Sequence, residues 1–160
     1  MVDTSTEDEF AAFFADVEQR LRLSLVAAFG YHIGRDAAAD ALAWGWRNWD
    51  RLRAMDNPAG YLYRVGQSRA LKAIAREGPA GGASNGASAG CEVPEFEPQL
   101  RSLLSGLPEQ QRVSVWLVHG LGYRHREVAE LLGCSISTIA THVRRGLAAL
   151  RVGLEVNVDG

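Results

Sequence analysis

The residues best suited to contact a ligand lie on one predicted helix, which covers positions 136–150. At about 100° per residue, its polar side chains gather opposite a narrow apolar stripe, as in a helix that packs on a domain. The hydroxyl, imidazole and guanidinium groups of the polar face are suited to phosphates and base edges. The predicted apolar stripe consists of Ile136, Ile139, Ala140, Val143, Leu147 and Leu150. The predicted DNA-facing residues are Ser137, Thr138, Thr141, His142, Arg144 and Arg145.

The residues before this helix complete the pattern of a helix-turn-helix. A short helix is predicted from Arg126 to Leu132, with the small Ala129 facing its partner helix. Gly133 permits the tight turn, and Ser135 can cap the second helix. A surface hairpin with solvated arginines would carry the same charges. Hydroxyl and arginine pairs that follow an Ala-x-x-x-Gly turn are rarer, and they favour DNA binding.

The composition is that of a globular protein, with 47% hydrophobic and 22% charged residues among 160. No apolar run reaches the length of a membrane span, so no membrane insertion is expected. The acidic, polar start does not have the pattern of a signal peptide. Cys91 and Cys134 are the only cysteines and do not make a disulfide framework. We therefore expect a cytoplasmic protein.

The net charge of −2 conceals two basic segments. Residues 47–76 hold seven basic side chains against two acids, and residues 124–151 hold five arginines against two glutamates. Residues 1–18 hold six acids and no Lys or Arg, which suits the beginning of a helix. Because phosphate binding depends on local rather than net charge, each basic segment can contact DNA.

The sequence lacks the motifs of common enzymes. It has neither a Gly-Lys-Ser phosphate loop nor a His-Glu-x-x-His pair. Its cysteines and histidines do not have the spacing of metal ligands, and its carboxylates are scattered. We therefore expect no catalytic residue, no metal, no cofactor and no small-molecule substrate.

A segment rich in Gly, Ala and Ser, GPAGGASNGASAG at residues 78–90, divides the chain. This composition cannot bury a core, and it predicts a flexible linker. Helical periodicity dominates on both sides, and no convincing strand alternation is found. The predicted fold is all-α, with two small helical domains at residues 6–76 and 97–154 and a linker at 77–96. The second domain is predicted to be a helix-turn-helix of the winged-helix-like kind.

Three main helices are expected in the first domain. Thr6 and Glu9 form a candidate capping box for the first helix, and Gly30 ends it. Asp36 can cap a second helix, which is expected to continue to about Arg53.

Further start signals define the remaining helices. The pair Asn57–Pro58 predicts a third helix that runs to about Arg76. In the second domain, helices are expected at residues 96–104 and from Leu107 to about His119, ahead of the helix-turn-helix.

Two blocks of the sequence together resemble the extracytoplasmic-function (ECF) group of bacterial RNA polymerase sigma factors. NPAGYLYRVGQSRALKAIAR at 57–76 is similar to the family's Asn-Pro helix. DAAADALAWGWRNWDRL at 36–52 is similar to the helix that docks on the polymerase clamp. LPEQQRVSVWLVHGLGYRHREVAELLGCSISTIATHVRRGLAALR at 107–151 resembles the family's second block. The segments at 36–52 and 57–76 form the first block, and the segment at 107–151 forms the second. Finding both blocks in this order, joined by a linker, is more specific than finding either block alone.

The resemblance implies a protein that binds core RNA polymerase, recognises the minus-ten and minus-thirty-five promoter elements and helps to melt the DNA. An anti-sigma factor is a further implied partner. At the upstream element it implies DNA contacts by the polar face of residues 136–150, with Arg124 and Arg126 bound to phosphates. At the downstream element it implies contacts by Arg64, Gln67, Ser68, Lys72 and Arg76. A base-capture loop is implied at Met55, Asp56 and Asn57, and polymerase docking at Asp40, Trp44 and Arg47.

Three features depart from the family pattern. Ala43 and Trp44 stand where the docking helix usually carries Gln and Glu. Docking on polymerase then either uses Arg47, Trp44 and Trp46 in a different way or is weak. Ala140 replaces a commonly basic residue, and His142 stands where Arg is common.

Two other functions fit these residues. The chain would be a DNA-binding regulator that does not program polymerase if docking were lost. It would be an interaction module if Trp44, Trp46 and Trp49 bound another protein. Tryptophans at helical spacing are more often part of a core, which disfavours the second of these alternatives.

Overall fold

The structure is a computed structural model that describes residues 4–77 and 98–158. The described residues form helices joined by turns, without a strand among them, so the predicted all-α fold is confirmed. The chain divides into two compact units, Met1–Gly86 and Ala87–Gly160, which are described here one at a time. The linker predicted between the two domains lies outside the described residues, except for Glu77.

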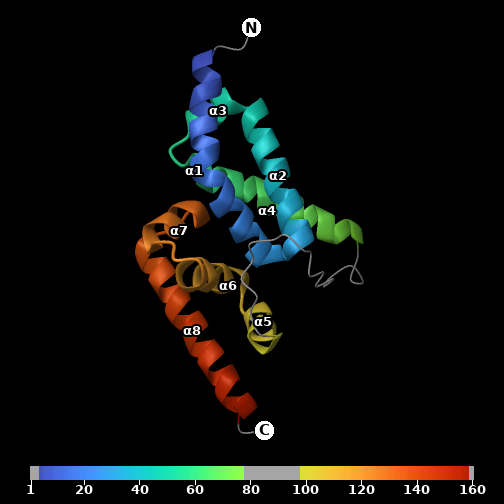
Figure 1. Cartoon of the computed structure of the whole chain (residues 1–160), viewed down its shortest axis with the longest axis vertical. Helices are drawn as coiled ribbons and strands as arrows, with labels where there is room; N and C mark the ends of the chain where they lie inside the picture. Colours follow the sequence, from blue (N-terminus) through green and yellow to red (C-terminus); the bar gives the residue numbers. More distant parts are fainter. Residues whose placement is uncertain (1–3, 78–97, 159–160) are drawn as a thin grey trace. The chain divides into compact units, whose positions relative to one another are not determined.

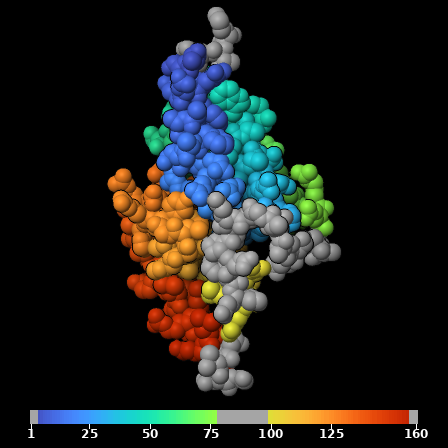
Figure 2. Space-filling model, in the orientation of Figure 1, coloured from blue at the N-terminus to red at the C-terminus, as the bar shows by residue number. Residues whose placement is uncertain are grey.

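Unit 1 is built on a pair of long helices. α1 and α2 lie side by side, and α4 packs against both of them (Figure 1). Figure 2 shows the atoms of α1 and α2 in contact along one face of the unit. Leu21, Leu25, Leu52 and Leu62 are fully buried in its core. The helices are α1 (Thr4–Phe29), α2 (Tyr31–Arg47), α3 (Trp49–Arg53) and α4 (Pro58–Glu77).

The first helix begins earlier than its capping residues predicted. α1 starts at Thr4, so Thr6 lies inside the helix and the predicted capping box is wrong. The carboxylate of Glu9 instead accepts a hydrogen bond from Nη1 of Arg53, at 2.9 Å. Two residues 44 positions apart in the sequence thus decide the role of Glu9, which local spacing cannot anticipate.

The second predicted helix differs at both of its ends. α2 begins at Tyr31, so Asp36 is an internal residue rather than its cap. Gly30 connects α1 to α2 with φ at 87°, a left-handed conformation that glycine adopts readily. At the other end, the backbone N–H and the side-chain amide of Asn48 both donate to the carbonyl of Trp44, at 3.0 and 2.9 Å. The helix ends there, and α3 is a separate helix.

The close packing of α1 and α2 depends on Gly34. A Cβ atom at this position would overlap the carbonyl of Leu25 and the Cα atom of Val26. Because backbone atoms cannot rotate aside as a side chain can, only glycine permits this approach of the two helices. The requirement is visible only in the packed structure.

The start of α4 follows the prediction. Pro58 is its first residue, and Oδ1 of Asn57 accepts a hydrogen bond from the backbone N–H of Gly60 at 2.9 Å. This is a side-chain cap of the kind predicted from the Asn-Pro pair.

Unit 2 gathers its shorter helices on one long helix. α5, α6 and α7 each pack against α8 (Figure 1). Val113, Leu117, Val128, Leu131 and Ile139 form its fully buried interior. The helices are α5 (Pro98–Ser105), α6 (Glu109–Val115), the π-helical turn η1 (Trp116–Gly120), α7 (His125–Leu132) and α8 (Ile136–Val158).

The helix predicted from Leu107 to about His119 changes its winding before it ends. η1 closes with a hydrogen bond from the backbone N–H of Leu121 to the carbonyl of Trp116, at 3.0 Å. Gly122 follows with φ at 76°, a left-handed conformation that glycine adopts readily. In the described part of the chain, no helix is both long and apolar enough to cross a membrane.

Candidate nucleic-acid interface

The helix-turn-helix in unit 2 is held by hydrogen bonds at each of its junctions. The backbone N–H of Arg124 donates to the carboxylate of Glu127 at 2.8 Å, which fixes the start of α7. Gly133 ends α7 with φ at 68°, and the N–H of Cys134 donates to the carbonyl of Ala129 at 3.0 Å. The turn predicted at Gly133 is therefore present, with the left-handed backbone that glycine favours.

The second helix of the motif is capped as expected. Oγ of Ser135 accepts a hydrogen bond from the backbone N–H of Thr138 at 3.1 Å. The same oxygen lies 3.0 Å from Oγ of Ser137 and 2.8 Å from Oγ1 of Thr138. One turn later, Oγ1 of Thr141 donates to the carbonyl of Ser137 at 3.0 Å. The hydroxyl groups at the start of α8 thus form a network with the helix itself.

The buried face of α8 is turned relative to the predicted stripe. Ile139, Val143 and Leu150 are buried as predicted. Ile136 is 52% exposed and Ala140 is also exposed, so the prediction is wrong for these two.

The cause of this rotation is Gly146, a residue that the apolar pattern did not include. It is buried, and a Cβ atom there would lie 2.5 Å from Cγ2 of Val115 in α6. Contact with α6 through this glycine rotates the buried face by roughly 40°.

The predicted DNA contacts of the helix-turn-helix fall into two groups. Ser137, Arg144 and Arg145 are exposed on α8, and Arg124 and Arg126 are exposed at the start of α7. The other three, Thr138, Thr141 and His142, are half-buried.

His142 differs most from its expected role. Nδ1 of its ring is buried, and no described residue hydrogen-bonds to it. The ring is therefore partly directed into the domain.

Cys134 lies in the turn between α7 and α8 and is half-buried. Burial raises the pKa of its thiol, because desolvation disfavours the thiolate. A partly buried thiol of this kind packs as a small apolar side chain. The other cysteine, Cys91, lies outside the described residues.

A second exposed face with basic residues lies on α4 in unit 1. Of the predicted downstream contacts, Arg64, Ser68, Lys72 and Arg76 are exposed and Gln67 is half-buried. Leu71 is 53% exposed on the same side of the helix, which the charge pattern alone did not single out. A helical projection that starts from Arg64 places Leu71 beside it and would have found this residue.

The loop before α4 presents its three predicted base-capture residues unequally. Asp56 is exposed, whereas Met55 and Asn57 are half-buried. The Asn57 side chain is engaged by the N–H of Gly60. It therefore positions the loop against α4.

The predicted docking residues share one side of α2. Asp40 and Arg47 are exposed. Trp44, which lies between them in the sequence, is half-buried. Spacings of four and three residues place the three on neighbouring turns of one helix face. The Trp44 ring packs against Tyr61 of α4 with ring centroids 5.2 Å apart, so α4 fixes the orientation of this tryptophan.

The three tryptophans of this region do not form a single cluster. Trp46 and Trp49 pack on Phe10 of α1, with ring centroids 5.0 and 5.3 Å away, whereas Trp44 contacts Tyr61. Trp49 is buried, and Trp46 is 42% exposed. The expectation that these tryptophans belong to the core thus holds for Trp49.

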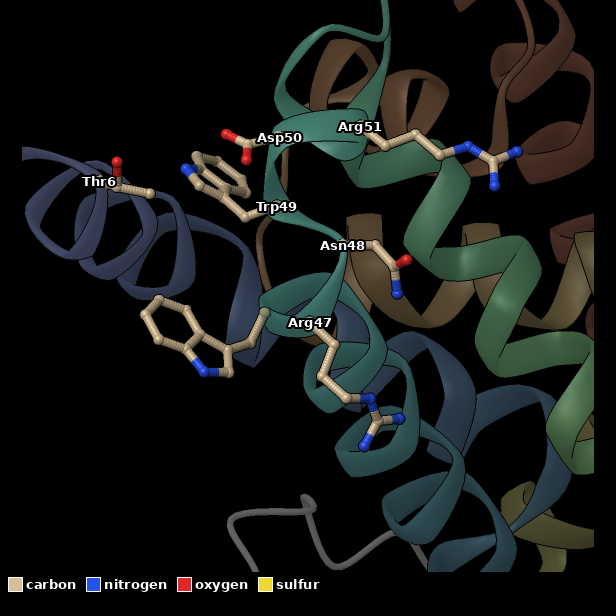
Figure 3. A pocket seen from close by; sticks show the side chains of 7 residues that line it. Thr6, Arg47, Asn48, Trp49, Asp50 and Arg51 are labelled. Carbon is tan, nitrogen blue, oxygen red and sulfur yellow. The ribbon is translucent and has the colours of Figure 1, made fainter. Parts of the chain in front are cut away.

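A shallow pocket of about 440 Å³ opens where α1, α2 and α3 meet. Figure 3 shows the ring of Trp49 beside Asp50, with the side chains of Arg47 and Arg51 extending away from Thr6. The sequence did not predict this pocket, because its walls come from segments more than 40 residues apart. In the part of the chain that the structure describes, no three His, Cys, Asp or Glu side chains converge as metal ligands would. The lining residues are Thr6, Trp46, Arg47, Asn48, Trp49, Asp50 and Arg51.

The helix-turn-helix and the helices packed on it match a known family. Residues 98–150 match the family described as Sigma-70, region 4. The second unit is therefore similar to a sigma-70 region 4 domain, and the match covers about a third of the chain. The matched residues begin with α5 and end in α8 at Leu150, so they include every predicted DNA contact of the second unit.

One further protein and one solved structure are also similar to this chain. The ECF RNA polymerase sigma factor EcfG of Rhodopseudomonas palustris (strain TIE-1) is 35% identical over 63 residues, 39% of this chain. That match spans about a third of the relative, 34% of its length. The sigma factor RpoE of Bartonella quintana, solved in complex with the anti-sigma factor NepR, has a similar fold. Its TM-score is 0.62 at 20% identity, over 92% of this chain and 98% of that chain. The resemblance to ECF sigma factors is confirmed.

Proposed function

We propose that this protein is an RNA polymerase sigma factor that binds core polymerase and directs it to promoters. The observation that carries the proposal is the exposed face of α8, with Arg144 and Arg145, in a domain of the sigma-70 region 4 family. A recognition helix reads base edges from the major groove, whereas arginines on its flanks hold phosphates. The geometry of α8 suits both tasks.

At the upstream element, the region 4 domain contacts DNA in two ways. Arg124 and Arg126 precede and begin α7, where they reach phosphates and fix the position of the domain. Arg144 and Arg145 lie further along α8, where a guanidinium can donate two hydrogen bonds to the edge of a guanine. Thr138 and Thr141 contribute less through hydrogen bonds, because their hydroxyl groups already have partners in the helix.

At the downstream element, the exposed face of α4 contacts the DNA. Arg64, Ser68 and Lys72 are spaced four residues apart and present donors on one side of the helix. Asp56 and Met55 of the preceding loop form the wall against which an extruded base would rest. Since extruding a base costs a few kcal/mol, the capped start of α4 is needed to hold this loop in place.

Docking on the polymerase uses the face of α2 that carries Asp40, Trp44 and Arg47. The stacking of Trp44 on Tyr61 presents a fixed apolar surface between two opposite charges. Such a surface, with a buried aromatic edge and a charged rim, is typical of protein interfaces. An anti-sigma factor is a further proposed partner, by analogy with the complex of RpoE and NepR.

The test is co-purification of the full chain with core RNA polymerase, followed by run-off transcription on a pool of genomic promoters. We expect stable binding and new transcription start sites. Asp40→Ala should weaken polymerase binding, and Arg145→Ala should weaken or redirect promoter choice. Arg101→Ala removes an exposed arginine of α5 outside the proposed interfaces and should change neither.

A second function is kept because of the docking helix. Ala43 is exposed and carries no polar group where the family usually has one, and Trp44 is half-buried against Tyr61. A chain that binds promoter DNA but not core polymerase would be a helix-turn-helix regulator. That result in the co-purification experiment would replace the proposed function by this one.

A further inference from the structure

The exposed face of α8 carries apolar side chains inside the proposed DNA contact. Ile136 is 52% exposed at the first turn, and Ala140 is exposed one turn later. Arg144 follows at the next turn and is also exposed. Because residues four apart lie one above the other, the three form a row along the helix.

The polar residues beside this row have much of their hydrogen-bonding capacity engaged. Thr141 donates its hydroxyl proton to the carbonyl of Ser137 at 3.0 Å. Ser137 and Thr138 both share contacts with Oγ of Ser135, at 3.0 and 2.8 Å. The first two turns of α8 therefore present an apolar strip, formed by Ile136 and Ala140, to a groove. The side-chain donors available to DNA are those of Arg144 and Arg145, further along the helix.

We propose that Ile136 and Ala140 contact the C5-methyl groups of thymines in the major groove of the upstream promoter element. This inference rests on the proposed function and specifies the bases that the region 4 domain reads. Thymine is the base that offers a methyl group in the major groove, and apolar side chains recognise it by contact. The N-terminal residues of a recognition helix are those that reach base edges.

The charge around the strip favours DNA over a protein partner as its occupant. Arg144 and Arg145 follow the strip on α8, and Arg124 and Arg126 are exposed at the start of the neighbouring helix. Four exposed guanidinium groups on the same helix-turn-helix as an apolar strip suit a polyanion that exposes methyl groups. Ile136 and Ala140 are about 6 Å apart along the helix axis, which is nearly two base-pair steps of about 3.4 Å, so they can reach different base pairs.

The test uses the full chain with core polymerase and a promoter pool whose upstream element is randomised. After the preferred element is found, each of its thymines is replaced by deoxyuridine, which lacks only the methyl group. At one or two positions we expect about fourfold weaker binding, the effect of one buried methyl group. Ile136→Ala should bind thymine and deoxyuridine equally at one of these positions.

A matched variant controls for the loss of an exposed apolar side chain. Val152→Ala alters a residue of α8 that is 60% exposed and lies beyond the recognition segment. It should keep the full preference for thymine. Circular dichroism should show both variants folded, because neither side chain is buried.

Three results would overturn the inference while DNA binding is retained. They are an upstream element without thymine, equal binding of thymine and deoxyuridine at every position, and a thymine preference that Ile136→Ala leaves intact at every position. If Ile136→Ala weakens polymerase binding without DNA and deoxyuridine has no effect, the strip is a protein contact instead. If the chain and polymerase recognise no promoter, the proposed function fails, and the inference fails with it.

Discussion

Replacing Ser135 should separate the stability of α8 from its contact with DNA. Oγ of Ser135 accepts the backbone N–H of Thr138 at 3.1 Å, and the side chain is exposed, so Ser135→Ala removes a cap without leaving a cavity. Loss of such a cap costs about 1 kcal/mol of the free energy of unfolding. This corresponds to roughly a fivefold larger unfolded fraction of unit 2 at equilibrium.

Two further substitutions at the same position complete the series. Ser135→Asn retains an oxygen acceptor and should keep both stability and DNA affinity. Ser135→Asp also keeps the cap, and its charge is favourable at the start of a helix. On DNA, however, a carboxylate about 7 Å from a phosphate is repelled by about 0.6 kcal/mol in water. Two such phosphates would weaken binding roughly eightfold.

Urea unfolding followed by circular dichroism measures the stability of the three variants, and anisotropy titration at several salt concentrations measures their DNA affinity. If Ser135→Ala unfolds at the same urea concentration as the natural chain, the cap does not stabilise α8. If Ser135→Asp binds DNA as tightly as Ser135→Asn, the start of α8 does not face the phosphates. The second result would refute the proposed upstream contact.

Three other experiments, with four substitutions and one chemical treatment, test separate parts of the structure. Gly34→Ala should lower the free energy of unfolding by at least about 2 kcal/mol, because its Cβ overlaps backbone. A Cβ atom at Gly45 would meet only the ends of leucine side chains, 3.2 Å away. Gly45→Ala should therefore change the free energy of unfolding by less than about 1 kcal/mol in the same urea titration. Arg64→Ala and Lys72→Ala should each reduce the slope of log affinity against log salt by about one, and an unchanged slope would exclude phosphate contacts. Burial raises the pKa of Cys134, so iodoacetamide should alkylate it more slowly than free cysteine at pH 8, and faster as the pH rises. Peptide mass mapping measures the rate. Equal rates for Cys134 and free cysteine at pH 8 would contradict this prediction.

Predictions from neighbouring residues were accurate at three helix junctions and wrong at two, the Thr6–Glu9 capping box and the Asp36 cap. The Asn-Pro start of α4, the glycine turn after α7 and the Ser135 cap of α8 are all present. Each depends on hydrogen bonds or backbone conformations within about four residues, so local residue types were sufficient to predict it.

Predictions that depended on packing partners were less accurate. The apolar stripe of α8 was placed about 40° away from the buried face, because periodicity counts apolar side chains and gives no weight to a buried glycine. Glu9 was expected to help cap the first helix, but its carboxylate instead accepts a hydrogen bond from Arg53, 44 positions away. Among the candidate site residues, burial reduced the exposure of His142, Met55 and Asn57 in ways that the pattern did not foresee.

The sequence by itself determined that the described residues are helical, where the turns at Gly30, Asn57 and Gly133 fall, and which two helices carry exposed basic residues. Local propensities, caps and charges depend on neighbouring residues, so they are the same in any packing arrangement that keeps those helices. Only the tertiary structure decided which face of α8 is exposed, because contact with Val115 through Gly146 rotates the helix about its axis. That orientation leaves Ile136 and Ala140 exposed on the same helix as Arg144 and Arg145, and the base preference that we propose depends on this exposure.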